Sequence, residues 1–350
     1  MKKIFRPVAL LLAFLTFIFL FNYLVDPANV FYERYEETVA DILLSGNNAE
    51  GVENMDDRRF LRLYASSRTQ PIDTLVLGSS RAMQITRAVT GDPNTFVAGV
   101  TGSDLRDCIS AYFLFENEGF RPKTVVLSLE FWYLSQGNMD TRALTEEYEI
   151  FCRKIGSTPV VTTSASLNKL KNFFSFTYFQ SSVEYLVKGK RKYLPFATTE
   201  TNAVSAVKRV DGSYGYEESL REQSQAVIDS SARDKQVVDN IAAGFSGVSP
   251  SLSEQLDAFV GYLQQQGIQV RLLLSPVHPL YYDYMLENPD VYSIVFDSES
   301  FYRSVGGHYG VSVYGSFSPA LVGANNYDFY DEVHPRESAV ARYYNLEIKK

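Results

Sequence analysis

Residues 74–81 read Thr-Leu-Val-Leu-Gly-Ser-Ser-Arg, a short apolar run that ends in a turn. Apolar side chains on successive positions are typical of a strand that is covered on both faces. Ala82-Met83-Gln84-Ile85 then favours the start of a helix, and Gly78 lets the chain turn tightly between the two. A serine at such a turn lies at the carboxyl edge of the sheet, where open α/β folds bind ligands. The stretch therefore predicts an α/β fold with a candidate nucleophile at Ser79 or Ser80, although a serine here also serves as a helix cap.

The same alternation continues outward from this stretch, with short apolar runs between longer helical segments. The predicted strands are residues 74–77, 95–100, 124–129, 270–274 and 311–314. The predicted helices are residues 105–118, 252–266, 298–305 and 337–346. Strands and helices that alternate in this way give a five-stranded parallel sheet with helices on both faces, which is a flavodoxin-like three-layer sandwich.

Composition limits the classes of protein to which the chain can belong. Its 350 residues are 45% hydrophobic, so it can build a large core, and a disordered or fibrous chain is excluded. The net charge of −8 and a pI near 5.1 argue against nucleic acid as a partner, because phosphate binding needs a basic surface. From Asp26 onward the chain carries 30 positive and 41 negative side chains, a net charge of −11.

The N-terminal segment, residues 1–25, is expected to be a transmembrane signal anchor. Residues 8–25 contain no charged side chain and are just long enough to cross a bilayer as a helix. A cleaved signal peptide is the alternative, but the run is not followed by a small-x-small cleavage site. Lys2, Lys3 and Arg6 precede it and would keep the N-terminus in the cytoplasm. The rest of the chain would then lie outside the cytoplasm, in a periplasmic or extracellular space.

Two further segments interrupt the regular pattern. Residues 26–70 are expected to form a stalk that leads into the fold, and residues 135–250 an insertion that serves as a lid or cap. Residues 71–134 and 251–350 then make up the α/β domain. A basic cluster within the insertion indicates a solvated face, or a contact with an anionic glycan or a lipid surface. Its members are Lys188, Lys190, Arg191 and Lys192.

The two cysteines, Cys108 and Cys152, have no metal-type spacing. In an oxidising compartment they form either one disulfide or two buried thiols. His278, His308 and the scattered acidic residues show no metal-ligand spacing either, and we expect no cofactor. His308 lies between a predicted helix and a predicted strand and is expected in a loop.

A second chemical motif follows the fifth predicted strand. It reads Asp331-Glu332-Val333-His334, so it also falls at the carboxyl edge of the sheet. Side chains three positions apart can meet, and the carboxylate of Asp331 can then hold one imidazole nitrogen while the other faces a cavity. An imidazole held in this way accepts the proton of a serine. A surface histidine in a turn before Pro335 is the alternative.

Together, the Gly-Ser-Ser turn after the first strand and the C-terminal Asp-x-x-His resemble the SGNH, or GDSL-type, hydrolase and acyltransferase superfamily. The resemblance covers residues 71–134 and 265–350 at motif level, and it implies three catalytic residues: Ser80 as nucleophile, His334 as base and Asp331 as its orienting acid. It also implies an oxyanion hole formed by the N–H groups of Ser80 and Gly102, with Gly99 as the alternative to Gly102.

The chain departs from the family pattern at three places. Ser79 stands where the family usually has Asp, and Arg81 follows the nucleophile. The Gly-x-Asn-Asp block expected after the third strand is replaced by Ser128-Leu129-Glu130-Phe131-Trp132. The Asn donor to the oxyanion is therefore absent, and Glu130 cannot replace it unless it is protonated. Loss of one such donor typically lowers turnover by about 10²–10³.

The chain is most similar to the membrane-anchored envelope branch of the superfamily, which includes alginate O-acetyltransferase-like and teichoic acid D-alanylation proteins. The similarity consists of Gly-Ser-Ser with Asp-x-x-His, the single N-terminal anchor and Asp26-Pro27 directly after it. The resemblance implies a serine acyltransferase or esterase acting on an acylated, O-acetylated envelope polysaccharide. Its partners are the membrane, the glycan and a membrane-bound acyltransferase. The alternative is an inactive SGNH-like scaffold that binds glycan or assembles with such an acyltransferase. The candidate substrate-binding residues are Arg81, Glu130, Trp132 and His278.

Overall fold

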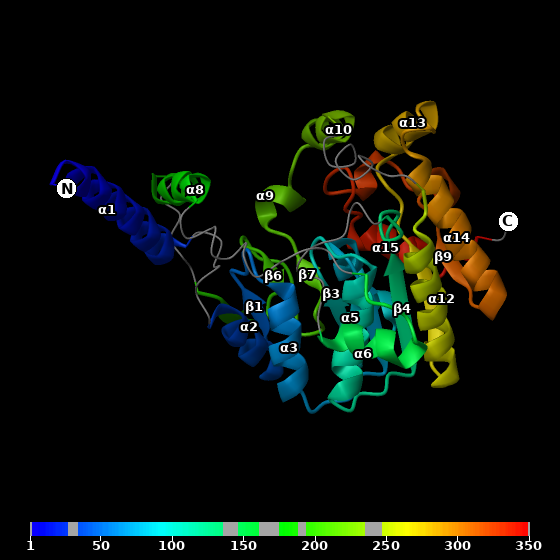
Figure 1. Cartoon of the computed structure of the whole chain (residues 1–350). Coiled ribbons are helices and arrows are strands. Elements are labelled where there is room, and N and C mark those ends of the chain that lie inside the picture. Colours follow the sequence, from blue (N-terminus) through cyan, green and yellow to red (C-terminus); the bar gives the residue numbers. More distant parts are fainter. Residues whose placement is uncertain are drawn as a thin grey trace.

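The computed structural model describes residues 2–26, 34–135, 146–160, 175–187, 194–234 and 247–348. A five-stranded sheet forms its centre, with all neighbours parallel in the order β3-β2-β4-β8-β9 (Figure 1). Its strands are β2 (Thr74–Gly78), β3 (Thr95–Gly99), β4 (Thr124–Leu129), β8 (Gln269–Leu274) and β9 (Val313–Gly315). The five predicted strands and the parallel α/β sheet are thus confirmed. After β2, strand β3 is added on one side and β4, β8 and β9 on the other, so the strand order switches between β2 and β4. In open parallel sheets, ligands bind at the carboxyl ends of the strands at such a switch point.

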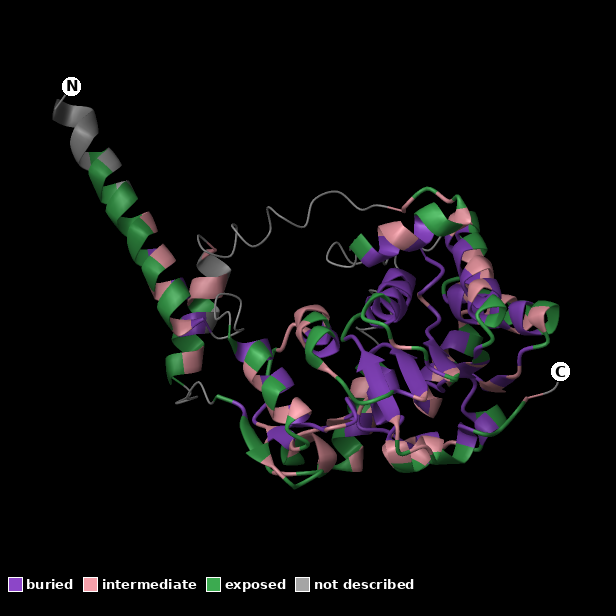
Figure 2. Ribbon diagram, turned by 90° about the horizontal axis from the view of Figure 1, so that it is seen from below, coloured by how far each residue is buried: buried purple, intermediate pink, exposed green. Residues whose placement is uncertain are grey.

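Helices cover both faces of the sheet because successive side chains of each strand point to opposite sides. Leu75 and Leu77 belong to one core cluster, whereas Val76 between them belongs to a second. The first cluster includes side chains of α5 (Leu105–Asn117), α12 (Pro250–Gln265) and α14 (Ser293–Tyr309). The second includes side chains of η1 (Ser80–Gln84) and α15 (Glu337–Tyr343). Figure 2 accordingly shows the strands of this central sheet as mostly buried.

The four predicted helices are confirmed as α5, α12, α14 and α15, with different ends. Helix α14 begins at Ser293, five residues before the predicted start, and α15 ends at Tyr343, three residues before the predicted end. The segment that was expected to open a helix after Ser80 is instead the single 3₁₀ turn η1, which ends at Gln84.

A small second sheet joins two segments that the sequence pattern treats separately. Its four strands are antiparallel in the order β5-β1-β6-β7. They are β1 (Asn48–Glu50), β5 (Phe196–Thr198), β6 (Val207–Lys208) and β7 (Tyr214–Gly215). Strand β1 comes from the segment expected as a stalk, and the other three come from the insertion. The two segments therefore pack together beside the main sheet.

The segment before β2 contributes to the core. It contains α2 (Tyr35–Leu44) and α3 (Asp57–Ser67). Phe60 and Tyr64 of α3 are fully buried, and the Tyr64 ring stacks on Phe96 of β3 at 4.5 Å between centroids. Residues 35–67 are thus part of the folded body, where a stalk was expected.

The remaining helices are short and lie mainly in the insertion and after β8. They are α4 (Arg87–Thr90), α6 (Glu146–Ile155), α8 (Phe176–Val187), α9 (Glu218–Arg221), α10 (Gln225–Asp234), α13 (Pro279–Glu287), η3 (Ala320–Val322) and η4 (Asn326–Asp328). The predicted basic cluster at residues 188–192 lies outside the described residues. Cys108 and Cys152 are both buried free thiols, so they do not form the disulfide that the sequence left open.

Helix α1 (Lys2–Val25) extends away from the folded body, and most of its described side chains are exposed (Figure 2). Across the ranges given above, no helix is long and apolar enough to cross a membrane. The transmembrane anchor expected over residues 1–25 is therefore not shown by the fold and stays a prediction from the sequence.

Candidate active site

Ser80 follows directly from the carboxyl end of β2, at the switch point between β2 and β4. Ser79 has extended backbone angles, and its hydroxyl caps the turn by accepting a hydrogen bond from the Arg81 N–H at 3.1 Å. A side chain on Gly78 would collide with its neighbours, because an added Cβ would lie 2.8 Å from Cβ of Ser128 on β4. Gly78 is thus required by the close approach of the turn to β4, and Ser79, not Ser80, is the helix cap.

His334 lies beside Ser80, in the loop between η4 and α15. Its Nε2 is 2.8 Å from Oγ of Ser80, and its Nδ1 is 2.7 Å from Oδ2 of Asp331. The other oxygen of Asp331 accepts the backbone N–H groups of Val333 and His334, at 2.9 and 2.8 Å. The structure therefore brings Ser80, His334 and Asp331 together as one chain of hydrogen bonds.

The charge of Asp331 sets the proton arrangement in this chain. Burial acts to raise its pKa, but the nearby His334 and the hydrogen bonds to the carboxylate outweigh burial and hold the pKa below its ordinary value. Asp331 is accordingly ionised at neutral pH and accepts the proton of Nδ1. Nε2 of His334 is then the unprotonated nitrogen and can accept the hydroxyl proton of Ser80.

A cavity of about 350 Å³ opens over these residues. Its wall combines Ser80, Asp331 and His334 with side chains from the two segments that form the small sheet. Those from the segment before β2 are Val52, Asn54, Met55 and Asp57, and those from the insertion are Tyr214, Tyr216, Glu217 and Leu220. Nothing in the sequence marked these residues, because their segments reach the site only through the pairing of β1 with β6.

Tyr216 is the most informative of the residues that were missed. Its ring lies edge-on to the imidazole of His334, with 5.8 Å between centroids. Its hydroxyl is buried and has no hydrogen-bond partner in the described part of the chain. Burial also raises the pKa of Tyr216 well above its ordinary value, so the group stays a neutral donor. A buried hydroxyl without a partner costs about 1–3 kcal/mol, and a bound ligand would remove that cost.

The loop after β3 carries the predicted oxyanion donor. Gly102 has a φ of +62°, a conformation that favours glycine, and a Cβ there would meet no atom within 4 Å. Thr101 lines the cavity, and its N–H donates to Asp57 at 2.9 Å. In the described ranges, the N–H groups of Ser80 and Gly102 make no hydrogen bond. Gly99 is the last residue of β3, and a Cβ there would lie 2.8 Å from Met83.

Arg81 and Glu130 were expected to bind substrate, and the structure contradicts that expectation. Arg81 is 1% exposed and Glu130 is fully buried, and the two form an ion pair at 2.5 Å. Glu130 also accepts a hydrogen bond from the Ser79 hydroxyl. Arg81 donates hydrogen bonds to the backbone oxygens of Ser275 and Pro276. These contacts join the ends of β2, β4 and β8 beneath the serine turn. Ser79 is thus bonded to an acid that directly follows β4.

Trp132 and His278, the other two candidate substrate-binding residues, also lie outside the cavity lining. The Trp132 indole N–H donates to the backbone oxygen of Ser103 at 2.9 Å, and its ring packs on Phe131. His278 is fully buried as the residue before α13, and its ring lies 5.3 Å from that of Phe329. His278 is thus held in the interior, and Trp132 is partly buried against the core.

His308 and the metal-type residues do not add a second site. His308 lies in the last turn of α14, not in the expected loop, and its Nδ1 is 3.2 Å from Asp257. Within the described part of the chain, no three His, Cys, Asp or Glu side chains are grouped so that they could hold a metal ion.

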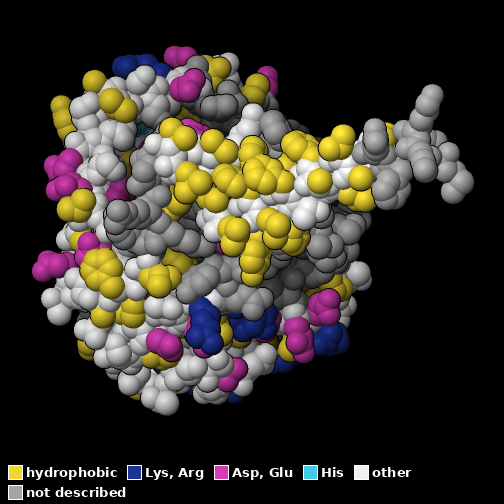
Figure 3. All heavy atoms as spheres, turned by 90° about the vertical axis from the view of Figure 1, so that its left-hand side faces the viewer, with side chains coloured by type: hydrophobic (Ala, Val, Ile, Leu, Met, Phe, Trp, Pro, Cys, Tyr) yellow, Lys and Arg dark blue, Asp and Glu magenta, His cyan; other side chains and the backbone are white. Residues whose placement is uncertain are grey.

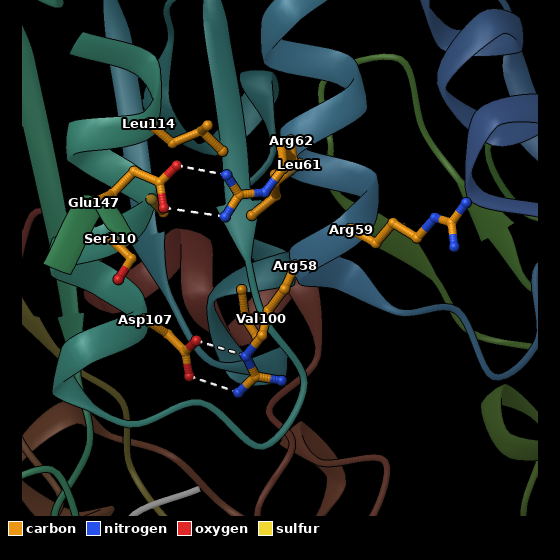
Figure 4. Close-up of a pocket in the computed structure, with 10 residues that line it drawn as sticks. Arg58, Arg59, Leu61, Arg62, Val100, Asp107, Ser110, Leu114 and Glu147 are labelled. Carbon is orange, nitrogen blue, oxygen red and sulfur yellow. Dashed lines mark hydrogen bonds and ion pairs between the residues drawn. The ribbon is translucent and has the colours of Figure 1, made fainter. Parts of the chain in front are cut away.

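A second cavity, of about 220 Å³, lies between α3 and α5 (Figure 4). Arg58 of α3 donates to both carboxylate oxygens of Asp107 at 2.7 Å, and Arg62 donates to Glu147 at 2.7 and 3.1 Å. The four charged groups thus face one another in pairs across the cavity. No histidine is among the described residues that line it, so the candidate site is the cavity over Ser80.

Comparison with known proteins adds no relative from which a role could be transferred. No protein-family model matches the chain, and no curated protein matches it. The candidate site therefore rests on its own geometry.

Proposed function

We propose that the protein is a serine-dependent acyltransferase or esterase of SGNH type, in which Ser80 is the nucleophile, His334 the base and Asp331 the residue that orients His334. The observation that carries this proposal is the chain of hydrogen bonds from Ser80 through His334 to Asp331. It lies at the carboxyl edge of a parallel sheet and opens into a cavity large enough for an acyl group.

The reaction has two halves. Oγ of Ser80 attacks the carbonyl carbon of an ester while its proton passes to Nε2 of His334, and Asp331 stabilises the resulting imidazolium. The tetrahedral intermediate then expels the alcohol, which takes the proton from His334 and leaves an acyl group on Ser80. A sugar hydroxyl or water gives its proton to His334 as it attacks the carbonyl carbon of the acyl-enzyme. The second tetrahedral intermediate then breaks its bond to Oγ of Ser80, which takes the proton back from His334, and the acylated sugar or the free acid is released.

The oxyanion in this proposal is held by the N–H groups of Ser80 and Gly102. The family's Asn donor is absent, and its place is taken by Glu130, whose side chain is already engaged by Ser79 and Arg81. The hydroxyl of Tyr216 supplies a further hydrogen bond to the substrate. An enzyme with fewer oxyanion donors is expected to be slower by about 10²–10³ than one with the full set.

The charges of the cavity favour an uncharged acyl group. Asp57, Glu217 and Asp331 are among its described lining residues, and no Lys or Arg is. An anionic acyl group would be repelled there, whereas an acetyl ester would not. We therefore propose an O-acetylated envelope polysaccharide as the substrate, reached from outside the cytoplasm by a protein that α1 holds at the membrane.

The test is hydrolysis of p-nitrophenyl acetate and release of acetate from an O-acetylated polysaccharide by the purified full chain. Turnover by the wild type and its loss in His334→Ala support the proposal. Ser304→Ala is the control, because Ser304 is exposed on α14 and is not among the residues that line the cavity. Equal rates for wild type and His334→Ala would favour the inactive scaffold that binds glycan or partners a membrane acyltransferase, which the missing Asn donor also favours.

A further inference from the structure

Helix α8 of the insertion lies beside the end of α1, about 150 residues away in the sequence, as the close ring contacts between the two helices demonstrate (Figure 1). The ring of Phe179 is 4.8 Å from that of Phe21 and 6.0 Å from that of Phe17. The Asn22 amide also donates to the backbone oxygen of Ser175 at 3.2 Å. The contact therefore involves two turns of α1 and fixes α8 against it.

The contact with α8 lies within the apolar run of α1. Phe17 and Phe21 belong to the uncharged run of residues 8–25. At about 1.5 Å per residue, they lie roughly 12 and 6 Å before the end of α1. If this run enters lipid, as the proposed anchor requires, α8 reaches the same depth.

The two helices together present an apolar surface (Figure 3). Large apolar side chains are exposed on both helices, and we call this set the α1–α8 surface. Its members are Leu10, Leu12, Phe14, Phe17, Leu20, Tyr23 and Leu24 on α1, and Val183, Leu186 and Val187 on α8. Soluble surfaces rarely leave so many large apolar side chains together, and such a patch indicates an interaction site.

Helix α8 has the pattern of a helix that lies in the plane of an interface. Phe179, Val183 and Leu186 follow one another at helical spacing on one stripe. Gln180 and Glu184 are exposed on the neighbouring stripe, which becomes apolar only at Val187, the last residue of the helix. Its 12 residues span roughly 18 Å, which is too short to cross a bilayer. An amphipathic helix of this kind places its apolar stripe among acyl chains and its polar stripe among headgroups.

Charge identifies the type of lipid. Residues 188–192, directly after α8, supply four positive charges in sequence. Residues 188–192 lie outside the described ranges and form no part of the α1–α8 surface. From Asp26 onward the chain has a net charge of −11, so a local cluster of positive charges such as this one favours contact with an anionic surface.

We propose that α8 is a second membrane-binding element, which lies in the headgroup region of an anionic lipid surface beside α1. The proposal rests on the anchoring role of α1 in the proposed function. It gives the insertion a point of attachment to the membrane, and the same insertion supplies Tyr214 and Tyr216 to the cavity wall.

The experiment places spin labels on single cysteines of the full chain in vesicles of phosphatidylcholine and phosphatidylglycerol. Leu186→Cys reports on α8 and Leu12→Cys on α1, and both native cysteines are buried. Val227→Cys on α10 is the matched control, because Val227 and Leu186 are both 52% exposed. We expect the labels at Leu186 and Leu12 to collide more often with oxygen than with a water-soluble nickel complex, and the label at Val227 to do the reverse.

Two outcomes separate this proposal from the anchor. If the Leu12 label is in lipid and the Leu186 label is in water, the proposed membrane contact of α8 is wrong, but the anchor is not. That result would indicate that a protein or glycan covers α8. A Leu12 label in water overturns the anchor. In vesicles of phosphatidylcholine alone, the Leu186 label should move toward water, and an unchanged depth would refute the requirement for anionic lipid.

Discussion

Ser80 Oγ lies 2.8 Å from Nε2 of His334, although 254 positions separate the two residues in the chain. The parallel sheet is what joins them. Ser80 follows β2 and the His334 loop follows β9, and both therefore reach the same edge. Together with the hydrogen bond from His334 to Asp331, this contact supports the proposal that Ser80 is a nucleophile. The role of each neighbouring side chain can be tested by substitution.

Replacing Asp331 by Asn should leave the fold intact and remove most of the activity. The pKa of Asp331 is held below its ordinary value, so at neutral pH the wild type presents a carboxylate to Nδ1 of His334. An amide cannot stabilise the imidazolium, and kcat for p-nitrophenyl acetate is expected to fall by about 10³–10⁴. Asp297→Asn, at an exposed position of α14, is the control and should retain full activity. A fall below tenfold in Asp331→Asn would contradict the assigned role.

The pair of Arg81 and Glu130 should act on stability more than on substrate binding. Both side chains are buried, so Arg81→Met leaves the Glu130 charge unpaired and is expected to cost about 3–5 kcal/mol of unfolding free energy. Arg153→Met breaks an exposed pair with Glu149 and should cost less than about 1 kcal/mol. Denaturant titration of both variants measures the difference. Equal costs would show that the buried pair does not hold the serine turn.

Part of this structure could be predicted from the sequence, and the environment of Arg81 could not. The five strands were predictable because apolar runs such as residues 124–129 are covered on both faces, and the Asp331-x-x-His334 spacing is local. The burial of Arg81 was not predictable, since it depends on the carbonyl groups of Ser275 and Pro276 nearly 200 positions away. Pattern alone cannot distinguish a buried, paired arginine from one that faces a substrate.

The small sheet and α3 were missed for different reasons. Strands β6 and β7 have two residues each, which is too short for any alternation to be visible. Helix α3 did carry a signal, because Asp56 caps it and Phe60 and Tyr64 lie on one face. The small sheet brings Tyr216 and its neighbours to the cavity. Because the sheet was not predicted, this part of the cavity wall was not predicted either.

Tyr216→Phe should change stability and activity in opposite directions. Removing the buried hydroxyl that has no partner in the described chain is expected to raise the melting temperature, because the cost of burying it disappears. Losing a hydrogen bond of about 1 kcal/mol to the substrate should lower kcat/KM by roughly 3- to 10-fold. Thermal unfolding and steady-state kinetics on the same preparation test both effects. Unchanged kcat/KM would exclude a contact between Tyr216 and the substrate.

His278 should make the protein less stable in mild acid. Burial lowers the pKa of His278 below its ordinary value. The negative charges of Asp229 and Asp331 act to raise this pKa, and the positive charge of Arg233 acts to lower it further. Below the ordinary histidine pKa of about 6.5 the unfolded chain therefore takes up a proton that the folded chain does not, and the unfolding free energy falls as pH decreases. His278→Phe should flatten the dependence of melting temperature on pH between about 5 and 7. If His278→Phe kept the same dependence of melting temperature on pH as the wild type, groups other than His278 would be responsible for it.

The central claim is that Ser80 is the nucleophile, and covalent labelling of the full chain with a fluorophosphonate tests it most directly. Intact mass and peptide mapping should place one adduct on Ser80 in the wild type. The adduct should persist in Ser79→Ala, although more slowly because that hydroxyl caps the turn, and it should be absent in Ser80→Ala. An adduct of equal yield in Ser80→Ala, or none in the folded wild type, would contradict the account.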